Sequence, residues 1–172
     1  DSTGGGTLDA IASGAGGMVF TGGNTFTTSG GAQNIISGTR IGSENQGFNL
    51  NGQTATFNVA TGTDATSDLK VTGTIWNGGN VIKNGAGRLE FSAPQGYSGT
   101  TTVNEGTLRL GNGTSPTNLA DAADVLVAPG AMLHLDYSGT DQIHGLWVDG
   151  LQMPPGVYSS TSGFITGTGT LT

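Results

Sequence analysis

The side chains that could do chemistry in this sequence are few, and the first candidates are its two histidines, His134 and His144. His134 shares an alternating run, residues 131–137, with Asp136. Because side chains alternate along a strand, both should lie on its outward face, and His144 could lie on an adjacent coil of the fold. Two histidines and a carboxylate can hold a metal ion. Nothing close in sequence repeats the arrangement, so we expect solvated side chains and no bound metal or other cofactor.

Paired aspartates on expected loops are a second candidate. They are Asp64 with Asp68, Asp121 with Asp124, and Asp136 with Asp141. Calcium prefers several oxygen ligands supplied by such loops. The calcium-binding nonapeptide with its Gly-Gly-x-Gly-x-Asp core is absent, however. We therefore expect no structural calcium at these pairs.

An enzyme would need convergent groups, and the sequence does not indicate them. Glycoside hydrolysis needs two facing carboxyl groups, and an acid-rich surface aligns carboxylates by chance. A lyase needs basic groups that neutralise a uronate, and Lys83, Arg88 and Arg109 are the candidates for a basic ladder. Glu90 and Glu105 are interleaved with them. We expect no catalytic residues, so the protein should not be an enzyme.

Three aromatic residues, Trp76, Trp147 and Tyr97, are candidates for stacking on sugars. Buried or groove-lining packing is the expectation for each. The net charge of −7 argues against nucleic acid and against anionic membrane surfaces as partners. No apolar run approaches the roughly 18 residues of a membrane span, so we expect no membrane insertion.

The elements that must position these groups are short strands. Glycine makes up 33 of the 172 residues, and charged residues are only 10%. Disorder is disfavoured because Val, Ile, Thr and Phe recur in short alternating runs. The period of two predicts an apolar core. Its expected members are Phe20, Phe57, Val71, Leu89, Phe91, Val103, Leu108, Leu110, Leu133 and Leu135.

The corners between these strands are short and carry glycine or asparagine, as in residues 104–106 and 51–52, which fits turns with a positive φ angle. Three short strands and three corners recur after about 20 to 25 residues, a period typical of solenoids. The sequence therefore predicts an all-β fold, a single parallel β-helix whose coils stack about 4.8 Å apart.

Residues 69–111 resemble the autotransporter-associated β-strand repeat, also called the passenger-associated transport repeat. Its first run is matched by Lys83, Gly85, Gly87, Leu89 and Phe91. Its second run is matched by Tyr97, Ser98, Gly99, Thr101, Val103, Gly106, Thr107, Leu108 and Leu110. Residues 93–96 depart from the family at a corner, where a Gly and an Asn usually precede the aromatic. The closing segment, about 125–172, resembles the one found after such repeats in secreted bacterial proteins.

The resemblance implies a protein that is secreted, extracellular or at the cell surface. The family supplies no catalytic residues. We expect residues 1–172 to form one domain, a right-handed β-helix of about seven coils, with a structural or adhesive function. Two alternatives stay open. One is a carbohydrate-binding or carbohydrate-cleaving module, and the other is a fragment of an autotransporter passenger. The chain begins at Asp1 rather than Met, which suits a mature end left after signal-peptide removal, and an excised fragment would look the same.

Both ends of the chain carry similar strand-like sequence, which predicts head-to-tail self-association into a filament. The ends of a β-helix expose unpaired backbone groups, and an added strand can pair with them. The predicted residues are Gly4, Gly5, Gly6, Thr7 and Leu8 at one end and Gly167, Thr168, Gly169, Thr170, Leu171 and Thr172 at the other. The expected partner is thus the protein itself, with cell-surface or matrix polysaccharide as a second candidate.

Overall fold

The computed structural model describes residues 7–9, 18–19, 22–37, 47–114 and 119–172. In these ranges the regular structure is β, apart from one turn of 3-10 helix, η1 (Ser160–Ser162). The expectation of an all-β fold is confirmed.

Sheet I has seven parallel strands. In spatial order they are β1 (Thr7–Asp9), β4 (Asn34–Ser37), β7 (Leu69–Val71), β10 (Arg88–Phe91), β12 (Thr107–Leu110), β14 (Met132–Leu135) and β18 (Ile165–Gly167). Sheet II also has seven strands. They are β3 (Asn24–Thr28), β6 (Thr54–Val59), β9 (Asn80–Asn84), β11 (Thr101–Val103), β13 (Asp124–Val127), β16 (Gly145–Val148) and β17 (Leu151–Gln152).

Sheet III and a short two-stranded sheet complete the fold. Sheet III contains β2 (Met18–Val19), β5 (Gly47–Asn49) and β8 (Thr74–Trp76). The two-stranded sheet pairs β15 (Thr140–Asp141) with β19 (Thr170–Leu171). Among the named strands described, every pairing is parallel except that of β17 with β16.

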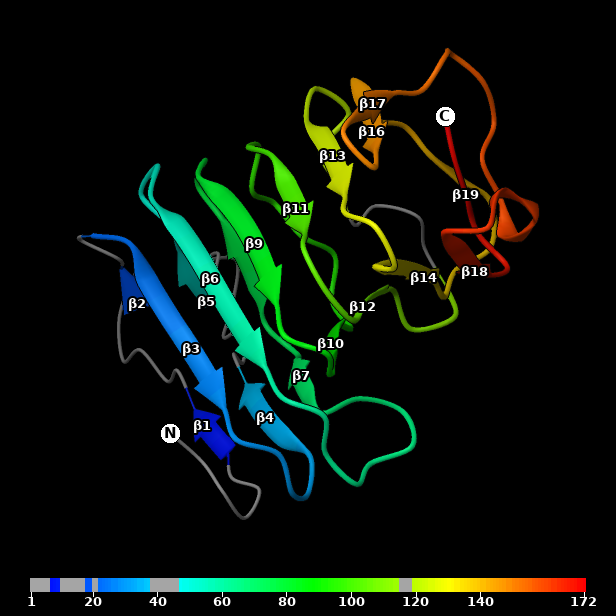
Figure 1. The fold of residues 1–172 in the computed structure, drawn as a ribbon. Helices are drawn as coiled ribbons and strands as arrows, with labels where there is room; N and C mark the ends of the chain where they lie inside the picture. Colours follow the sequence, from blue (N-terminus) through cyan, green and yellow to red (C-terminus); the bar gives the residue numbers. More distant parts are fainter. Residues whose placement is uncertain (1–6, 10–17, 20–21, 38–46, 115–118) are drawn as a thin grey trace.

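Successive strands of the chain belong to the three sheets in a repeating order. The sets β1-β2-β3, β4-β5-β6 and β7-β8-β9 each pass through sheets I, III and II in turn. Neighbouring strands in a sheet therefore come from successive passes, and parallel pairing follows. This arrangement, with β1–β3 at one end and β16–β19 at the other, is consistent with a β-solenoid (Figure 1).

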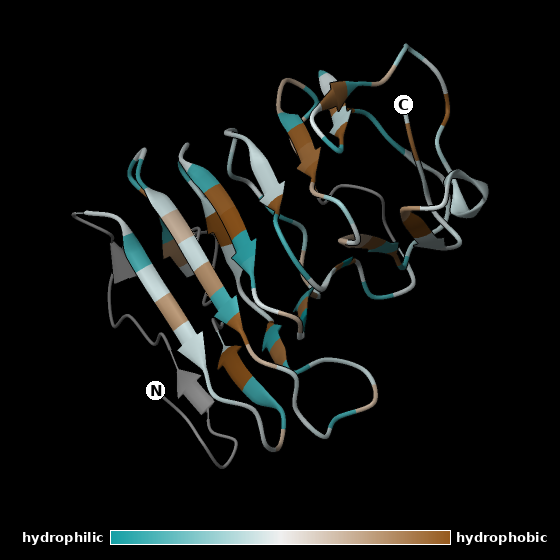
Figure 2. Ribbon diagram, in the orientation of Figure 1, coloured by the Kyte–Doolittle hydropathy of each residue, from teal (hydrophilic) through white to brown (hydrophobic). Residues whose placement is uncertain are grey.

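The core forms where the period-two apolar residues of the sheets meet, and Figure 2 shows hydrophobic bands recurring from strand to strand. Nine of the ten predicted core residues are buried, and the tenth, Phe20, lies outside the described residues. In register they stack like on like, as Leu89, Leu108 and Leu133 do across sheet I.

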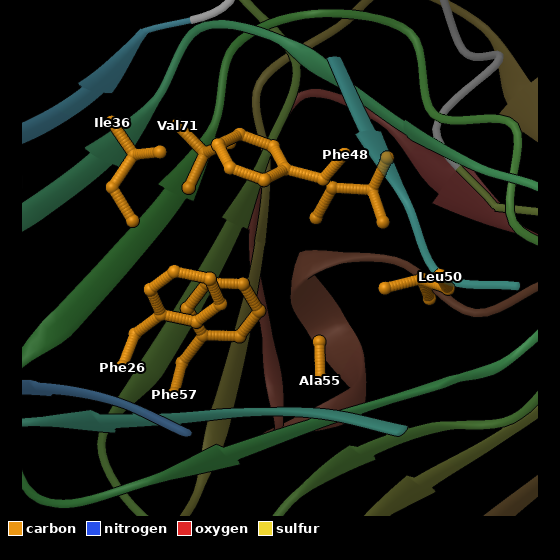
Figure 3. A pocket seen from close by; sticks show the side chains of 8 residues that line it. Phe26, Ile36, Phe48, Leu50, Ala55, Phe57 and Val71 are labelled. Atoms are coloured by element: carbon orange, nitrogen blue, oxygen red, sulfur yellow. The ribbon is translucent and has the colours of Figure 1, made fainter. Parts of the chain in front are cut away.

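Aromatic rings fill the interior near the β3 end. Phe26 and Phe57, neighbours on β3 and β6, stack with ring centroids 5.0 Å apart. Phe57 also meets Phe91 of sheet I edge-on at 5.7 Å. Figure 3 shows the stacked pair facing Ile36 and Val71 across the interior. The space between these side chains leaves no room for a water molecule, so it is packed core rather than a ligand pocket.

The backbones of successive corners lie in close contact. Gly106 has a φ of 67°, and a Cβ there would lie 2.5 Å from the carbonyl oxygen of Gly87 in the previous corner. Only glycine fits this position. Beside it, an asparagine ladder joins three corners, because Asn84 donates to Asn58 at 2.9 Å and Asn104 donates to Asn84 at 2.8 Å.

Candidate functional site

Charged side chains line up across the outer face of sheet I. Lys70, Glu90, Arg109 and His134 occupy matching positions on β7, β10, β12 and β14. Because parallel strands in register lie about 4.8 Å apart, such side chains stack directly over one another. We call these four residues the charged column.

Glu90 is the centre of the column. Its two carboxylate oxygens accept hydrogen bonds from Lys70 Nζ at 2.7 Å and from Arg109 Nη1 at 3.0 Å. The alternation of residues 88–91 predicts that Arg88 and Glu90 are exposed, and this is wrong for Glu90, of which only 2% is accessible. It does face outward, but the stacked cations on either side cover it. A buried carboxylate persists when it is paired in this way.

Arg109 extends the series of ion pairs to Asp136, whose Oδ2 accepts from Nη2 at 2.5 Å. His134 follows in the column, and its Nδ1 lies 2.9 Å from Thr166 Oγ1. Burial and the Arg109 charge lower the pKa of His134, and Asp136 opposes them. This lowering favours the neutral form of the His134 ring.

The candidate basic ladder of Lys83, Arg88 and Arg109 is only partly formed. Arg88 and Arg109 border one surface hollow, whereas Lys83 lies on sheet II with its side chain in the core. It is fully buried and in register with Phe57 and Val103.

The Lys83 ammonium reaches the edge of the core at a corner. It donates to the carbonyl oxygens of Asn84 at 3.0 Å, Gly85 at 2.6 Å and Glu105 at 3.0 Å. Burial lowers its pKa to about 8, against the opposing charges of Glu105 and Asp68. The lysine thus ties two successive corners together. Its inward position follows from its spacing of two residues from buried Val81, a signal that is present in the sequence.

The candidate metal trio is not assembled. His144 lies on the sheet II side, where its Nδ1 is 2.7 Å from Asp124 Oδ1. His134 instead lies on β14 of sheet I, and Asp136 directly follows that strand. In the described ranges, no group of three or more His, Cys, Asp or Glu side chains could hold a metal ion.

The loop aspartates act as backbone acceptors. Asp64 accepts from the backbone N–H groups of Thr66 and Ser67 and from the Thr66 hydroxyl, and these bonds lower its pKa to about 2. Asp68, mostly buried, accepts from the N–H groups of Gly62 and Arg88.

The pairs 121/124 and 136/141 are likewise divided between different contacts. Asp141 is buried and accepts from the backbone N–H of Leu119. Asp136 instead binds Arg109. Asp124 binds His144, and Asp121 is exposed.

The aromatic candidates for sugar stacking pack into the fold. Tyr97 is buried and its hydroxyl lies 2.7 Å from Thr101 Oγ1. Trp76 and Trp147 are partly buried. The indole nitrogen of Trp76 is covered and has no hydrogen-bond partner in the part of the chain that the structure describes.

Of the residues predicted for self-association, Thr7, Leu8 and Gly167 lie on the two edge strands of sheet I. Gly4, Gly5 and Gly6 lie outside the described residues, while Thr7 and Leu8 belong to β1 and pair with β4. Gly167 ends β18, at the opposite edge of the sheet.

The backbone of the last five residues is already bonded within the chain. N–H groups of Thr168 and Gly169 donate to Leu135, that of Thr170 to Gly139, that of Leu171 to Tyr158, and that of Thr172 to Asp141. Leu171 is buried. The N–H groups of this segment are thus bonded within the same molecule, and its part in self-association stays a prediction.

Residues 81–110 match the family model of the passenger-associated-transport-repeat. The resemblance seen in the sequence is confirmed for this stretch, which runs from β9 to β12 and includes Lys83, Glu90 and Arg109. The match indicates a β-repeat region of the kind found in autotransporter passengers. No curated protein and no solved structure matches the chain. Among the described elements there is no helix long and apolar enough to cross a membrane.

We expect a chelator to leave the thermal unfolding midpoint unchanged, because no three metal-ligating side chains converge in the described ranges and most of the paired aspartates bind cations, hydroxyls or backbone N–H groups. Differential scanning calorimetry with and without EDTA checks this. A fall of several degrees on chelation would restore the hypothesis of a structural metal.

Proposed function

We propose that the protein is a non-catalytic structural or adhesive β-solenoid that acts outside the cell and stacks head to tail into filaments. The observation that carries the proposal is sheet I, in which parallel strands follow one another from β1 to β18 without a reversal. A sheet of this kind has two unlike edges, so one copy can continue the sheet of the next.

The proposed winding is a single right-handed parallel β-helix. The repeated passage through sheets I, III and II supports one continuous winding. Connections between parallel strands of the same sheet are right-handed in nearly all proteins because of the twist of the strands. We therefore assign the right hand.

The proposed location, secreted or at the cell surface, is supported by the repeat match at residues 81–110, since the repeat is named for exported passengers. The absence of a catalytic role is supported by the way in which the titratable groups pair with one another. The net charge of −7 disfavours nucleic acid as a partner.

The proposed contact joins β18 of one copy to β1 of the next. Within the described residues, β1 and β18 each have a neighbouring strand on one side only. An edge strand with free N–H and C=O groups accepts a further strand by β-augmentation. The two edges are different surfaces, so the contact need not close and can extend as an open fibre.

Two exposed apolar side chains mark the same end of the molecule as β18. Leu151 on β17 is 72% exposed and Val157 is 67% exposed. They follow the antiparallel turn from β16 to β17, which ends sheet II (Figure 1). They are the two exposed large apolar side chains of the described residues, and both come from the part of the chain that ends sheet II, so we place them in the interface.

Sedimentation velocity over a concentration series tests the contact. Leu151→Asp combined with Val157→Asp should shift the assembly equilibrium towards monomer, because burying two carboxylates in an interface is costly. Thr102→Asp with Thr56→Asp is the matched control, since it adds the same charge to partly exposed positions of sheet II away from the ends. Equal assembly of the wild type and the variant with both Leu151→Asp and Val157→Asp would refute the proposed interface.

A further inference from the structure

A surface hollow of about 230 Å³ lies beside the charged column. It is lined by Ala65, Thr66, Arg88, Arg109 and His134. Two of these side chains are cations, although the whole chain carries only five Lys and Arg residues. None of the described residues that line the hollow is a carboxylate.

Arg88 is held in a fixed position by the loop that forms one wall. Its Nη1 donates to the carbonyl oxygens of Ala65 and Thr66, both at 2.8 Å. These two bonds use both hydrogens of Nη1. The Nε and Nη2 groups make no hydrogen bond to any residue that the structure describes. Together they form the edge of the guanidinium that binds a carboxylate through two parallel hydrogen bonds.

Arg109 and His134 are also fixed, but by different partners. Arg109 is paired with Glu90 and Asp136, so its charge is largely compensated. His134 uses Nδ1 at Thr166, which leaves Nε2 as its second polar atom. Recognition here would depend on open hydrogen-bond donors rather than on net charge.

We propose that this hollow is a binding site for a carboxylate group, held side-on by Arg88 and flanked by His134. The proposal rests on the proposed extracellular function, because outside the cell such a group comes from two sources. One is a free small carboxylate, and the other is the uronate of an acidic polysaccharide.

A bound carboxylate and a protonated His134 should stabilise each other by linkage. The charged groups that act on His134 are Arg109, Asp136, Arg88 and Glu90. The arginines oppose its protonation, and a bound anion would offset them. Binding should therefore strengthen as the pH falls, and ligand should raise the pKa of His134.

The test is an NMR titration of the full chain at low protein concentration, with sodium glucuronate in one arm and oligogalacturonate in the other. We expect shifts of the Arg88 Nε–H and His134 ring signals and a rise in the His134 pKa. Arg88→Gln should weaken binding about tenfold or more, as loss of a charged hydrogen-bond pair does. Lys70→Gln is the matched control. It also removes one positive charge from the outer face of sheet I, but Lys70 does not line the hollow. This variant should bind with an affinity within about twofold of the wild type.

Circular dichroism shows whether Arg88→Gln still folds, and Arg88→Lys, which keeps the charge without the fork, should bind with intermediate affinity. Tighter binding of the oligosaccharide than of glucuronate assigns the polysaccharide source, and equal binding assigns the small anion. Absence of shifts in both arms, or equal affinity of the Arg88→Gln variant, would overturn the site. Light scattering of the same samples keeps this outcome separate from that of filament formation.

Discussion

Replacing Leu108 with alanine should lower the free energy of unfolding by about 2 to 5 kcal/mol, the cost of a large-to-small change in a packed core. Leu108 is fully buried and sits between Leu89 and Leu133 in the leucine stack of sheet I. Its neighbours belong to strands that are paired on both sides, which limits their collapse into the cavity. For a chain of this size the thermal midpoint should fall by about 4 to 20 °C.

Urea denaturation followed by circular dichroism measures the change. Thr107→Ala is the control, because Thr107 precedes Leu108 on β12 and is only partly buried. It should cost less than about 1 kcal/mol. A loss of less than about 0.5 kcal/mol for Leu108→Ala would mean that Leu108 faces solvent and that the sheet I core is wrongly placed.

Replacing Lys83 with methionine should destabilise the protein by at least about 1 to 3 kcal/mol. Methionine fills the same space in the core, but it leaves the carbonyl oxygens of Asn84, Gly85 and Glu105 without their donor. Lys70→Met is the matched control. Lys70 is a partly exposed surface lysine, and its loss leaves Glu90 paired with Arg109, so the cost should stay below about 1 kcal/mol.

The same lysine predicts a pH dependence of stability. Its pKa is about 8 in the folded chain, below the usual 10.5, so between these values the unfolded chain binds the extra proton. Stability should therefore rise with pH, by about 2 kcal/mol between pH 7 and pH 9.5. Tyr97 and Tyr137 have raised pKa values through burial and oppose the trend at higher pH.

Urea midpoints at pH 7, 8, 9 and 9.5 check this prediction. The rise should be present in the wild type and in Lys70→Met, and absent in Lys83→Met. A wild-type stability that is flat or falling over this range would show that the Lys83 ammonium keeps its ordinary pKa and that the carbonyl oxygens around it offset its burial.

The core was predictable from the sequence because apolar alternation is a local signal. Residues such as Leu108 and Leu110 are two apart, and each strand reports its buried side independently. The corners were predictable for the same reason, since a positive φ, as at Gly106 and Asn51, depends on the type of a single residue. The repeat predicted which strands pair, because similar residues recur at the interval that separates neighbouring strands of one sheet.

The charged column was not predicted because its members are far apart in sequence and depend on register. Glu90 alternates outward, which is correct, but its burial comes from Lys70 and Arg109 on the adjoining strands. Opposite charges spaced by one repeat were the available signal. Lys83 was missed for a different reason, since its charge suggested the surface although its position in the alternation pointed inward.

The structure also changes the contact that we propose for the C-terminal end of the chain. A free strand was expected, whereas residues 168–172 are bonded to the preceding pass. The proposed contact is now between the outer edges of β18 and β1, an end-to-end continuation of one sheet rather than an exchange of strands.

Electron microscopy of the full-length chain over a concentration series, with light scattering of the same samples, tests the central claim most directly. Stacked solenoids should form unbranched fibres one molecule wide, with strands perpendicular to the fibre axis and a repeat of about 4.8 Å along it. Particles that remain monomeric by light scattering at every concentration, with no fibres on the grid, would contradict the claim.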